Sequence, residues 1–259
     1  MADSIPGLPG RRFGNAVLDL IPPGEADGLA SLLTQRHVRQ GTIVYNEVTP
    51  LEIVYFPLTS VLSAVTIMRE GTTVEIGTIG REGVGGVQTA LHIRRVPGEL
   101  VCQVAGDAYV MDADAFESAV ERLPGLRTAV NRYVQSLMNL MSQSIACNRL
   151  HGLAERCARW LLMMRDRAGG DSFYLTQEFL AYMLGVRRSG VSIAAGTLAN
   201  AGLIRYRRGN ITILDGEGLE SASCECYRVV RDRTERLMRG DDDHHRARSA
   251  VTGNGLPSS

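Results

Sequence analysis

The chain has 259 residues, of which 44% are hydrophobic and 22% charged, a composition typical of a globular protein with room for two modest domains. Its formal net charge is zero, so the whole-chain balance singles out no class of partner. The charge is unevenly distributed, because residues 1–148 hold 11 arginines and 15 acidic residues while residues 149–240 hold 15 and 10. A basic C-terminal half is typical of a domain that contacts phosphates.

We expect no export signal at the beginning of this sequence. Residues 1–15 have no apolar core after their arginines, so they do not form a signal peptide, and we expect them to be disordered. The uncharged run 53–68 is interrupted by polar residues and is shorter than the roughly 20 apolar residues of a membrane span. Five scattered cysteines argue against a disulfide framework. We therefore expect a cytoplasmic protein without a membrane partner.

Residues 38–111 have the pattern of an antiparallel β domain. Short segments rich in Val, Ile, Tyr and Thr alternate with Gly, Pro and Asn turn signals. These segments are 41–45, 52–57, 60–67, 73–79, 100–104 and 108–112. Their regular spacing predicts a small roll or barrel, which we assign to residues 16–122, with a short helix at 23–36 ahead of the strands.

A helical period follows, first over residues 112–121 and then over a long helix assigned to 123–148. Apolar residues recur in the long helix at alternating spacings of four and three, which is a heptad seam. The seam consists of Leu126, Val130, Tyr133, Leu137, Leu140 and Ser144. We expect this seam to form a homodimer interface. A second set, Val134, Met138, Met141 and Ile145, widens the apolar face, so one side of the helix is expected to pack on its own domain.

Residues 175–214 have the pattern of a winged helix-turn-helix, within a domain that we assign to residues 149–240. Thr176 begins a helix of about two turns, Gly185 allows a tight turn, and a second helix runs from about Arg187 to Asn200. A Gly-Asn turn then joins two short strands into a wing. The candidate DNA contacts are Thr176, Arg187, Arg188, Ser189 and Ser192 on the helices and Arg205, Arg207 and Arg208 on the wing. Because arginine can donate two hydrogen bonds to guanine, Arg188 is the expected base reader, and the wing arginines are expected on phosphates.

The order of these parts resembles the Crp/Fnr family of bacterial regulators, most specifically in the stretch LTQEFLAYMLGVRRSGVS at residues 175–192. The resemblance covers about residues 15–215. It implies an α+β fold with an N-terminal antiparallel β-roll of cyclic-nucleotide-binding type, a long dimerisation helix and a C-terminal winged helix-turn-helix. It also places Arg188 on the family's guanine-reading arginine, and Ser189 on the adjacent position, which is often Glu. The implied partners are double-stranded DNA with a pseudo-palindromic site, a second copy of the chain and RNA polymerase.

The sensor half departs from the family's pattern. Cyclic-nucleotide binders of this kind hold the ribose with a Glu and the phosphate with an Arg-Ser or Arg-Thr pair, and the corresponding positions lie near Gly86, Val96 and Pro97. The candidate effector pocket is therefore Gly83, Gly85, Gly86, Arg94 and Arg95, in which backbone amides or guanidinium groups would hold an anion. The alternative is that these glycines only serve tight turns. Classical cyclic AMP binding is not expected, and the cofactor stays unknown.

No metal site or catalytic centre is expected. The family's iron–sulfur sensors carry a cysteine cluster near the N-terminus, whereas the first cysteine here is Cys102. Cys224 and Cys226 form a late pair with no further ligand nearby, and the acidic and histidine-rich residues 241–245 are interpreted as part of a solvated tail at 241–259. The histidines considered for haem, which stand in no diagnostic motif, are His37, His92 and His151.

The sequence therefore predicts a DNA-binding transcription regulator and not an enzyme, because no nucleophile elbow or complete phosphate loop is present. Two interpretations of the β-roll stay open. It either switches the regulator through an effector, or serves as a scaffold or protein-interaction module of a constitutive DNA-binding protein.

Overall fold

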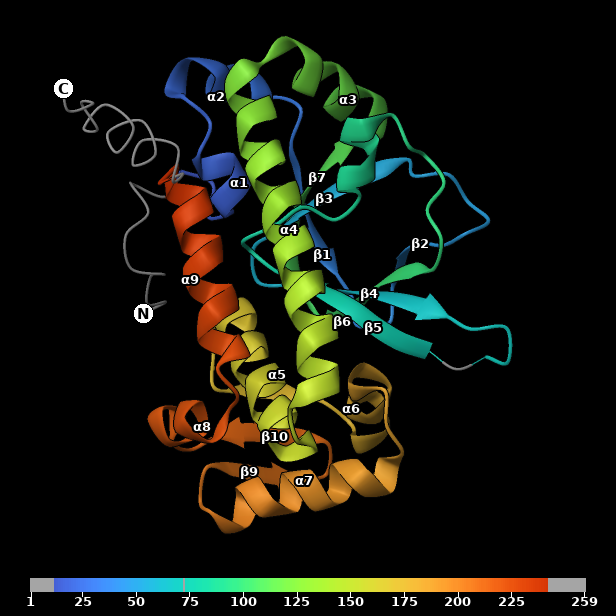
Figure 1. The fold of residues 1–259 in the computed structure, drawn as a ribbon. Coiled ribbons are helices and arrows are strands. Elements are labelled where there is room, and N and C mark those ends of the chain that lie inside the picture. Colours follow the sequence, from blue (N-terminus) through green and yellow to red (C-terminus); the bar gives the residue numbers. More distant parts are fainter. Residues whose placement is uncertain (1–11, 72, 242–259) are drawn as a thin grey trace, which may run out of the picture.

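Figure 1 shows the fold in a computed structural model, which describes residues 12–71 and 73–241. The expectations for residues 1–11 and 242–259 lie outside this part of the chain. The fold is α+β, as predicted, with antiparallel sheets, one long helix and a C-terminal domain that contains a helix-turn-helix. Within residues 12–71 and 73–241, no helix combines the length and the apolar character that a membrane span requires.

Two antiparallel sheets form the predicted roll. The first has the order β1-β7-β3, with β1 at Thr34–Val38, β3 at Ile53–Pro57 and β7 at Gly106–Asp112. The second has the order β2-β6-β4-β5, with β2 at Ile43–Tyr45, β4 at Val61–Ile67, β5 at Thr73–Ile79 and β6 at Glu99–Val104. Val54, Phe56, Leu62 and Leu100, which come from both sheets, are fully buried in one apolar core. The short antiparallel strands agree with the roll that the β-rich segments predicted.

Short helices close the roll. They are α1 at Ala16–Asp19, α2 at Pro23–Ala30, α3 at Ala113–Arg122 and the 3-10 helix η1 at Val87–Leu91. The helix predicted over residues 23–36 ends at Ala30, because residues from Thr34 onward pair with β7 in the register Thr34↔Val110. Pairing with a neighbouring strand here overrides the local helical pattern.

The long helix α4 spans Pro124–Leu150 and packs one face on the roll. This packing contradicts most of the predicted dimer seam, because four of its residues are buried within their own subunit. Their exposures are 0% for Leu126, 1% for Val130, 4% for Tyr133 and 5% for Leu140, while Leu137 and Ser144 are partly buried. The heptad spacing identified an apolar stripe correctly, but the stripe faces the roll.

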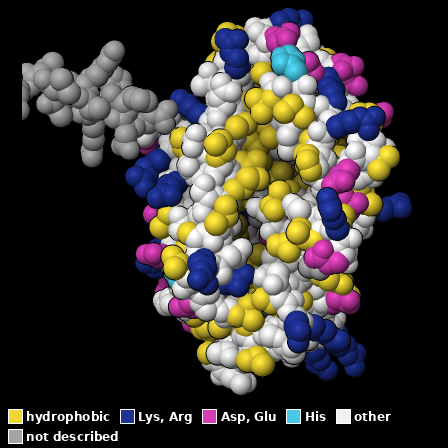
Figure 2. All heavy atoms as spheres, turned by 45° about the vertical axis from the view of Figure 1, so that its right-hand side comes forward, with side chains coloured by type: hydrophobic (Ala, Val, Ile, Leu, Met, Phe, Trp, Pro, Cys, Tyr) yellow, Lys and Arg dark blue, Asp and Glu magenta, His cyan; other side chains and the backbone are white. Residues whose placement is uncertain are grey.

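A neighbouring face of α4 is open in part, although Val134 on it also packs against the core of the roll. Met138 is 56% exposed and Ile145 is 73% exposed, whereas Val134 and Met141 are partly exposed. These four residues are separated by four, three and four positions, and we call them the outer stripe. Figure 2 shows hydrophobic side chains gathered around a hollow on the side of the molecule that α4 and the roll share.

The C-terminal domain begins after α4 and is built from helices around a small sheet (Figure 1). Its sheet has the order β8-β10-β9, with β8 at Ser172–Tyr174, β9 at Ile204–Arg207 and β10 at Asn210–Ile213. Its helices are α5 at Leu153–Ala168, α6 at Gln177–Leu184, α7 at Arg188–Asn200, α8 at Gly216–Ala222 and α9 at Cys226–Arg239. The last helix returns along α4, where the Ser136 and Thr234 hydroxyl oxygens lie 2.8 Å apart in a hydrogen bond.

The two halves of the molecule are docked on each other. The Trp160 indole N–H on α5 donates a hydrogen bond of 3.0 Å to Glu75 Oε1 on β5, and the Ser63 hydroxyl donates to the other carboxylate oxygen at 2.5 Å. Burial raises the pKa of Glu75, although these two hydrogen bonds act in the opposite direction. A partly buried carboxyl group, hydrogen-bonded from both halves, therefore lies at the boundary between the roll and the C-terminal domain.

Candidate nucleic-acid interface

The helix-turn-helix forms where the local signals placed it. The Thr176 hydroxyl oxygen accepts a hydrogen bond of 3.1 Å from the backbone N–H of Phe179 and so caps α6. Gly185 ends α6 in the left-handed region at φ +63°, which favours glycine. On α7, the buried residues are Val191, Ala194, Ala195 and Leu198. The turn and the inward face of both helices thus agree with the sequence pattern.

The first turns of α7 project a polar face to the outside. Arg187, Arg188, Ser189 and Ser192 are all exposed, as a reader of DNA bases requires. The sequence analysis missed Ile193, which lies beside them and is 73% exposed. An exposed isoleucine on such a helix can contact the methyl group of thymine. Only the high exposure distinguishes Ile193 from the buried apolar residues, so spacing alone would not have identified it.

The start of α7 also offers backbone donors. Arg187 stands at the cap position and makes no side-chain hydrogen bond to the first turn of the helix. The initial N–H groups of a helix lack partners within the helix, and together with its dipole they form an anion site. A DNA phosphate is the kind of anion that this end of α7 can bind.

The wing is a hairpin of β9 and β10 in which Asn210 pairs with Arg207. The turn residues are therefore Arg208 and Gly209, at φ +49° and +80°, and not the predicted Gly-Asn pair. Arg205, Arg207 and Arg208 are exposed on this hairpin. The Tyr206 hydroxyl donates a hydrogen bond of 2.7 Å to the Leu175 carbonyl, which ties the wing to the residues just before α6.

Residues 155–222 match the family model of the Crp-like helix-turn-helix domain. The chain carries a Crp-like DNA-binding domain and has the fold of Crp/Fnr transcription regulators. The match begins within α5 and ends with α8, and so includes both helices of the helix-turn-helix and the β9–β10 hairpin. The family resemblance that was drawn from residues 175–192 is thereby confirmed.

Solved structures support the same assignment of the Crp fold over most of the chain. FixK2 from Bradyrhizobium japonicum superposes with a TM-score of 0.63 at 16% identity, over 74% of this chain and 98% of that protein. CLP from Xanthomonas campestris, described as a c-di-GMP responsive global regulator, superposes with a TM-score of 0.60 at 12% identity, over 74% of this chain and 99% of that protein. A CRP-family transcriptional regulator from Thermus thermophilus superposes with a TM-score of 0.59 at 17% identity, over 73% of this chain and 96% of that protein. A comparison with curated protein sequences gives no significant match.

The glycines of the predicted effector pocket serve packing and pairing. The N–H of Gly85 donates to the Tyr55 carbonyl at 2.8 Å, and that of Gly83 donates to the Gly80 carbonyl at 3.0 Å. A Cβ atom on Gly83 would lie 2.5 Å from the ring of Tyr133, and Gly86 adopts φ +88°. Two of the three amides are therefore engaged within the roll, so the interpretation as structural glycines is favoured here.

The two arginines of that predicted pocket also have partners. Arg94 donates to Glu117 Oε2 at 2.5 Å and to Asp114 Oδ1 at 2.6 Å, both on α3. Arg95 donates to the Val48 carbonyl at 2.8 Å. The structure thus ties Arg94 to carboxylates and Arg95 to a loop, and it does not bring the two side chains to a shared anion site.

A cavity of about 860 Å³ lies elsewhere, between the end of β5, α4, α5 and α9. It is lined by five arginines and five acidic residues, with Tyr133 and Tyr227 on its walls. None of the five residues of the predicted effector pocket lines this cavity. Because its charges are balanced, the cavity does not single out an anionic effector.

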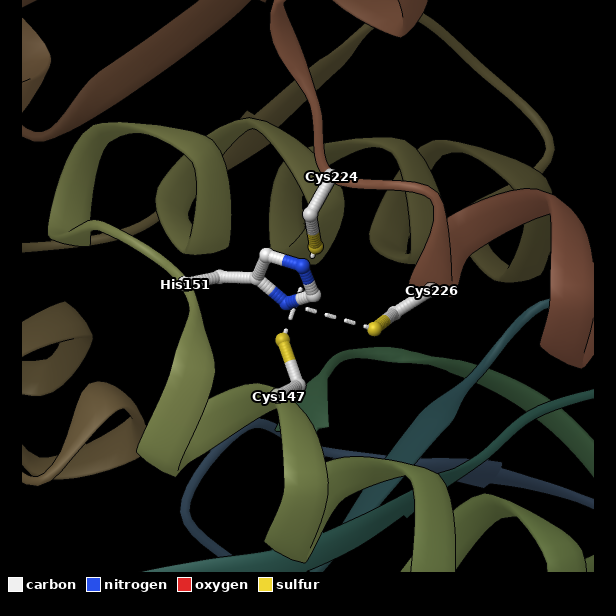
Figure 3. Close-up of side chains that lie close together, drawn as sticks. All are labelled: Cys147, His151, Cys224 and Cys226. Carbon is white, nitrogen blue, oxygen red and sulfur yellow. Dashed lines mark hydrogen bonds between the residues drawn. The ribbon is translucent and has the colours of Figure 1, made fainter.

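Four potential metal ligands meet where α4 ends (Figure 3). The thiol groups of Cys147, Cys224 and Cys226 and a ring nitrogen of His151 all lie within 4.8 Å of one another. This finding corrects the expectation that no further ligand lies near Cys224 and Cys226. A hydrogen bond from the Cys224 thiol to the Cys147 sulfur lowers the pKa of Cys147 to about 5. The signal in the sequence was a Cys-x3-His pair at the end of one predicted helix and a distant Cys-x-Cys pair.

Proposed function

We propose that the protein is a sequence-specific transcription regulator that binds DNA as a homodimer in the cytoplasm. The observation that carries this proposal is the exposed face of α7, where Arg188, Ser189, Ser192 and Ile193 project from a Crp-like domain. In this mode the first turns of the recognition helix enter the major groove. Arg188 then donates two hydrogen bonds to guanine, and Ile193 contacts a thymine methyl group.

Phosphate contacts come from the elements that flank α7. The wing arginines Arg205, Arg207 and Arg208 are exposed beside it, and the N–H groups at the helix start donate to a phosphate oxygen. Such contacts fix the position of the domain on the duplex and make binding sensitive to salt. They carry no base preference, so the preference is assigned to α7.

The dimer in this proposal forms through the outer stripe of α4 and not through the predicted seam. Met138 and Ile145 are the most exposed members of the stripe, and the spacing of four, three and four residues is that of a coiled coil. A two-fold dimer presents two copies of α7 to DNA and therefore favours a pseudo-palindromic site with half-sites about one helical turn apart.

Selection of bound sequences from a random pool of DNA duplexes tests the base-reading role of α7. Wild-type protein is expected to enrich one motif with two related halves. The variant Arg188→Ala is expected to lose about 1–3 kcal/mol of base discrimination per half-site while it keeps salt-sensitive binding to random DNA. Arg207→Ala is the matched control and should enrich the same motif with lower affinity. Selection of no motif by wild-type protein would contradict the proposal.

A constitutive regulator with a scaffolding roll is the second candidate. The observation in its favour is the engagement of Arg94 by Glu117 and Asp114 and of Arg95 by the Val48 carbonyl. A phosphate would have to displace these partners. The distinguishing measurement is DNA affinity with and without a small-molecule extract of the host cell, because a constitutive regulator shows no difference between the two.

A further inference from the structure

We propose that Cys147, His151, Cys224 and Cys226 bind a single zinc ion as its four ligands. The residues come from four places: Cys147 lies in α4, His151 directly follows its last residue, Cys224 lies in the turn between α8 and α9, and Cys226 begins α9. Figure 3 shows the four side chains pointing toward one common centre. Three thiolates and one imidazole are a ligand set of structural zinc sites.

The distances between the ligand atoms fit a tetrahedral ion. With Zn–S near 2.3 Å and Zn–N near 2.0 Å, tetrahedral geometry requires about 3.8 Å between sulfurs and about 3.5 Å between sulfur and nitrogen. The Cys147 and Cys224 sulfurs are 3.5 Å apart, and the Cys226 sulfur is 3.5 Å from His151 Nδ1. A cluster of several iron atoms spreads its ligands over a larger volume, so one ion fits better.

All five cysteines of the described chain are buried, but the surroundings of three of them differ from those of the other two. Cys102 and Cys157 pack within the two large apolar cores, as small hydrophobic side chains do. Cys147, Cys224 and Cys226 are 0%, 5% and 0% exposed and form a separate cluster with one another. Apolar packing alone does not account for three buried thiol groups that gather around a histidine.

The surroundings also fit the charge of a loaded site. Zinc with three thiolates and a neutral imidazole carries a net charge of −1, which favours a neighbouring cation and hydrogen-bond donors. Arg159 is only 8% exposed, and its charge acts on Cys147, while its guanidinium donates to Ser144 at 3.1 Å. The Gln143 amide donates to the Cys226 sulfur at 3.1 Å. These contacts are the kind that orient metal ligands and support their charge.

The place of the site gives the ion a role. His151 and Gly152 connect α4 to α5, so they join the sensor half to the DNA-binding domain. An ion held here fastens the turn before α9 to the end of α4. Because all four positions are filled by protein ligands, the ion is structural, with no open coordination position for catalysis.

Metal analysis of the full-length protein, purified with a non-chelating phosphine reductant, tests the proposal. We expect one zinc per chain by plasma mass spectrometry after exhaustive dialysis. Replacement by cobalt should give the visible absorption bands of a tetrahedral thiolate site. Cys226→Ser and His151→Ala should weaken zinc binding, measured by chelator competition, on the order of a hundred-fold or more, since even outer contacts contribute 10–100-fold. Cys102→Ser and Cys157→Ser, the matched controls, should bind zinc as wild type does.

A conservative variant separates loss of a ligand from loss of the fold. His151→Cys retains four ligands and is expected to keep the ion, whereas His151→Ala is not, and circular dichroism reports whether each variant is folded. Absence of bound zinc in wild-type protein supplied with micromolar zinc would overturn the proposal. Equal zinc affinity of wild type and Cys226→Ser would overturn it as well. None of these results bears on DNA binding through α7.

Discussion

Replacement of the two most exposed residues of the outer stripe should separate the subunits of the proposed dimer. Burial of a whole Met or Ile side chain contributes about 1.5–3 kcal/mol. Met138 and Ile145 expose 56% and 73% of their surface in the single subunit. If a partner covers that surface, the two contribute about 2–4 kcal/mol per subunit, and about 4–8 kcal/mol per dimer because each occurs twice at a two-fold interface.

The double variant Met138→Ser/Ile145→Ser is therefore expected to raise the dimer dissociation constant by about a thousand-fold or more, since about 1.4 kcal/mol corresponds to a factor of ten. Sedimentation equilibrium over a range of protein concentrations measures this constant. Ile43→Ser is the matched control, because Ile43 is 52% exposed on β2, away from α4. It should dimerise as wild type does.

Two results would refute this reasoning about the outer stripe. One is an unchanged dissociation constant in the double variant, and the other is a wild-type protein that is monomeric at micromolar concentration and on DNA. A substitution such as Leu137→Asp is unsuitable for this test. Leu137 is partly buried against both apolar cores of its own subunit, so a carboxylate there would destabilise the fold itself.

Three further predictions concern the wing, the domain boundary and the sensor. Arg207→Ala and Arg208→Ala should each weaken binding to all DNA sequences to a similar degree. Each should also make the dependence of log affinity on log salt concentration less steep, by the share of about one phosphate contact per subunit. A changed base preference would show that the wing reads bases. Because burial raises the pKa of Glu75, the folded protein binds a proton on this carboxyl group more tightly than the unfolded chain does. The stability that this tighter proton binding contributes is lost as the pH rises through the raised pKa. Glu75→Gln should therefore remove this loss, so that thermal melts of variant and wild type diverge toward neutral pH; parallel melting curves at all pH values would contradict the assignment. Calorimetric titration with cyclic AMP should detect weak binding or none, and micromolar affinity that is lost in Arg94→Ala would contradict the engagement of that arginine by Asp114 and Glu117.

Local signals predicted the DNA-binding half well. A capping threonine, a glycine in the left-handed region and a regular inward face are all encoded within a few residues, so Thr176, Gly185 and the start of α7 could be placed from sequence. The wing was displaced by one residue, because either Gly-Asn or Arg-Gly can form a two-residue turn. Strand pairing decides between them, and pairing is not visible in the sequence.

Features that depend on distant contacts were harder to predict. The heptad spacing in α4 is compatible with either of two apolar faces, and only the position of the roll shows that Leu126 and Val130 face inward. The cysteine cluster joins Cys147 to Cys224, which lie 77 positions apart, through the return of α9 along α4. Sequence spacing cannot reveal such a meeting before the path of the chain is known.

The hydrogen bond between Trp160 and Glu75 makes the boundary between the two halves optically observable. Trp160 is the only tryptophan in the chain and is 6% exposed, so its fluorescence reports from this boundary alone. Separation of the C-terminal domain from β5 would transfer the indole to water and shift its emission to longer wavelength. A stopped-flow instrument could thus follow the undocking of the DNA-binding domain in the natural sequence, without an attached dye.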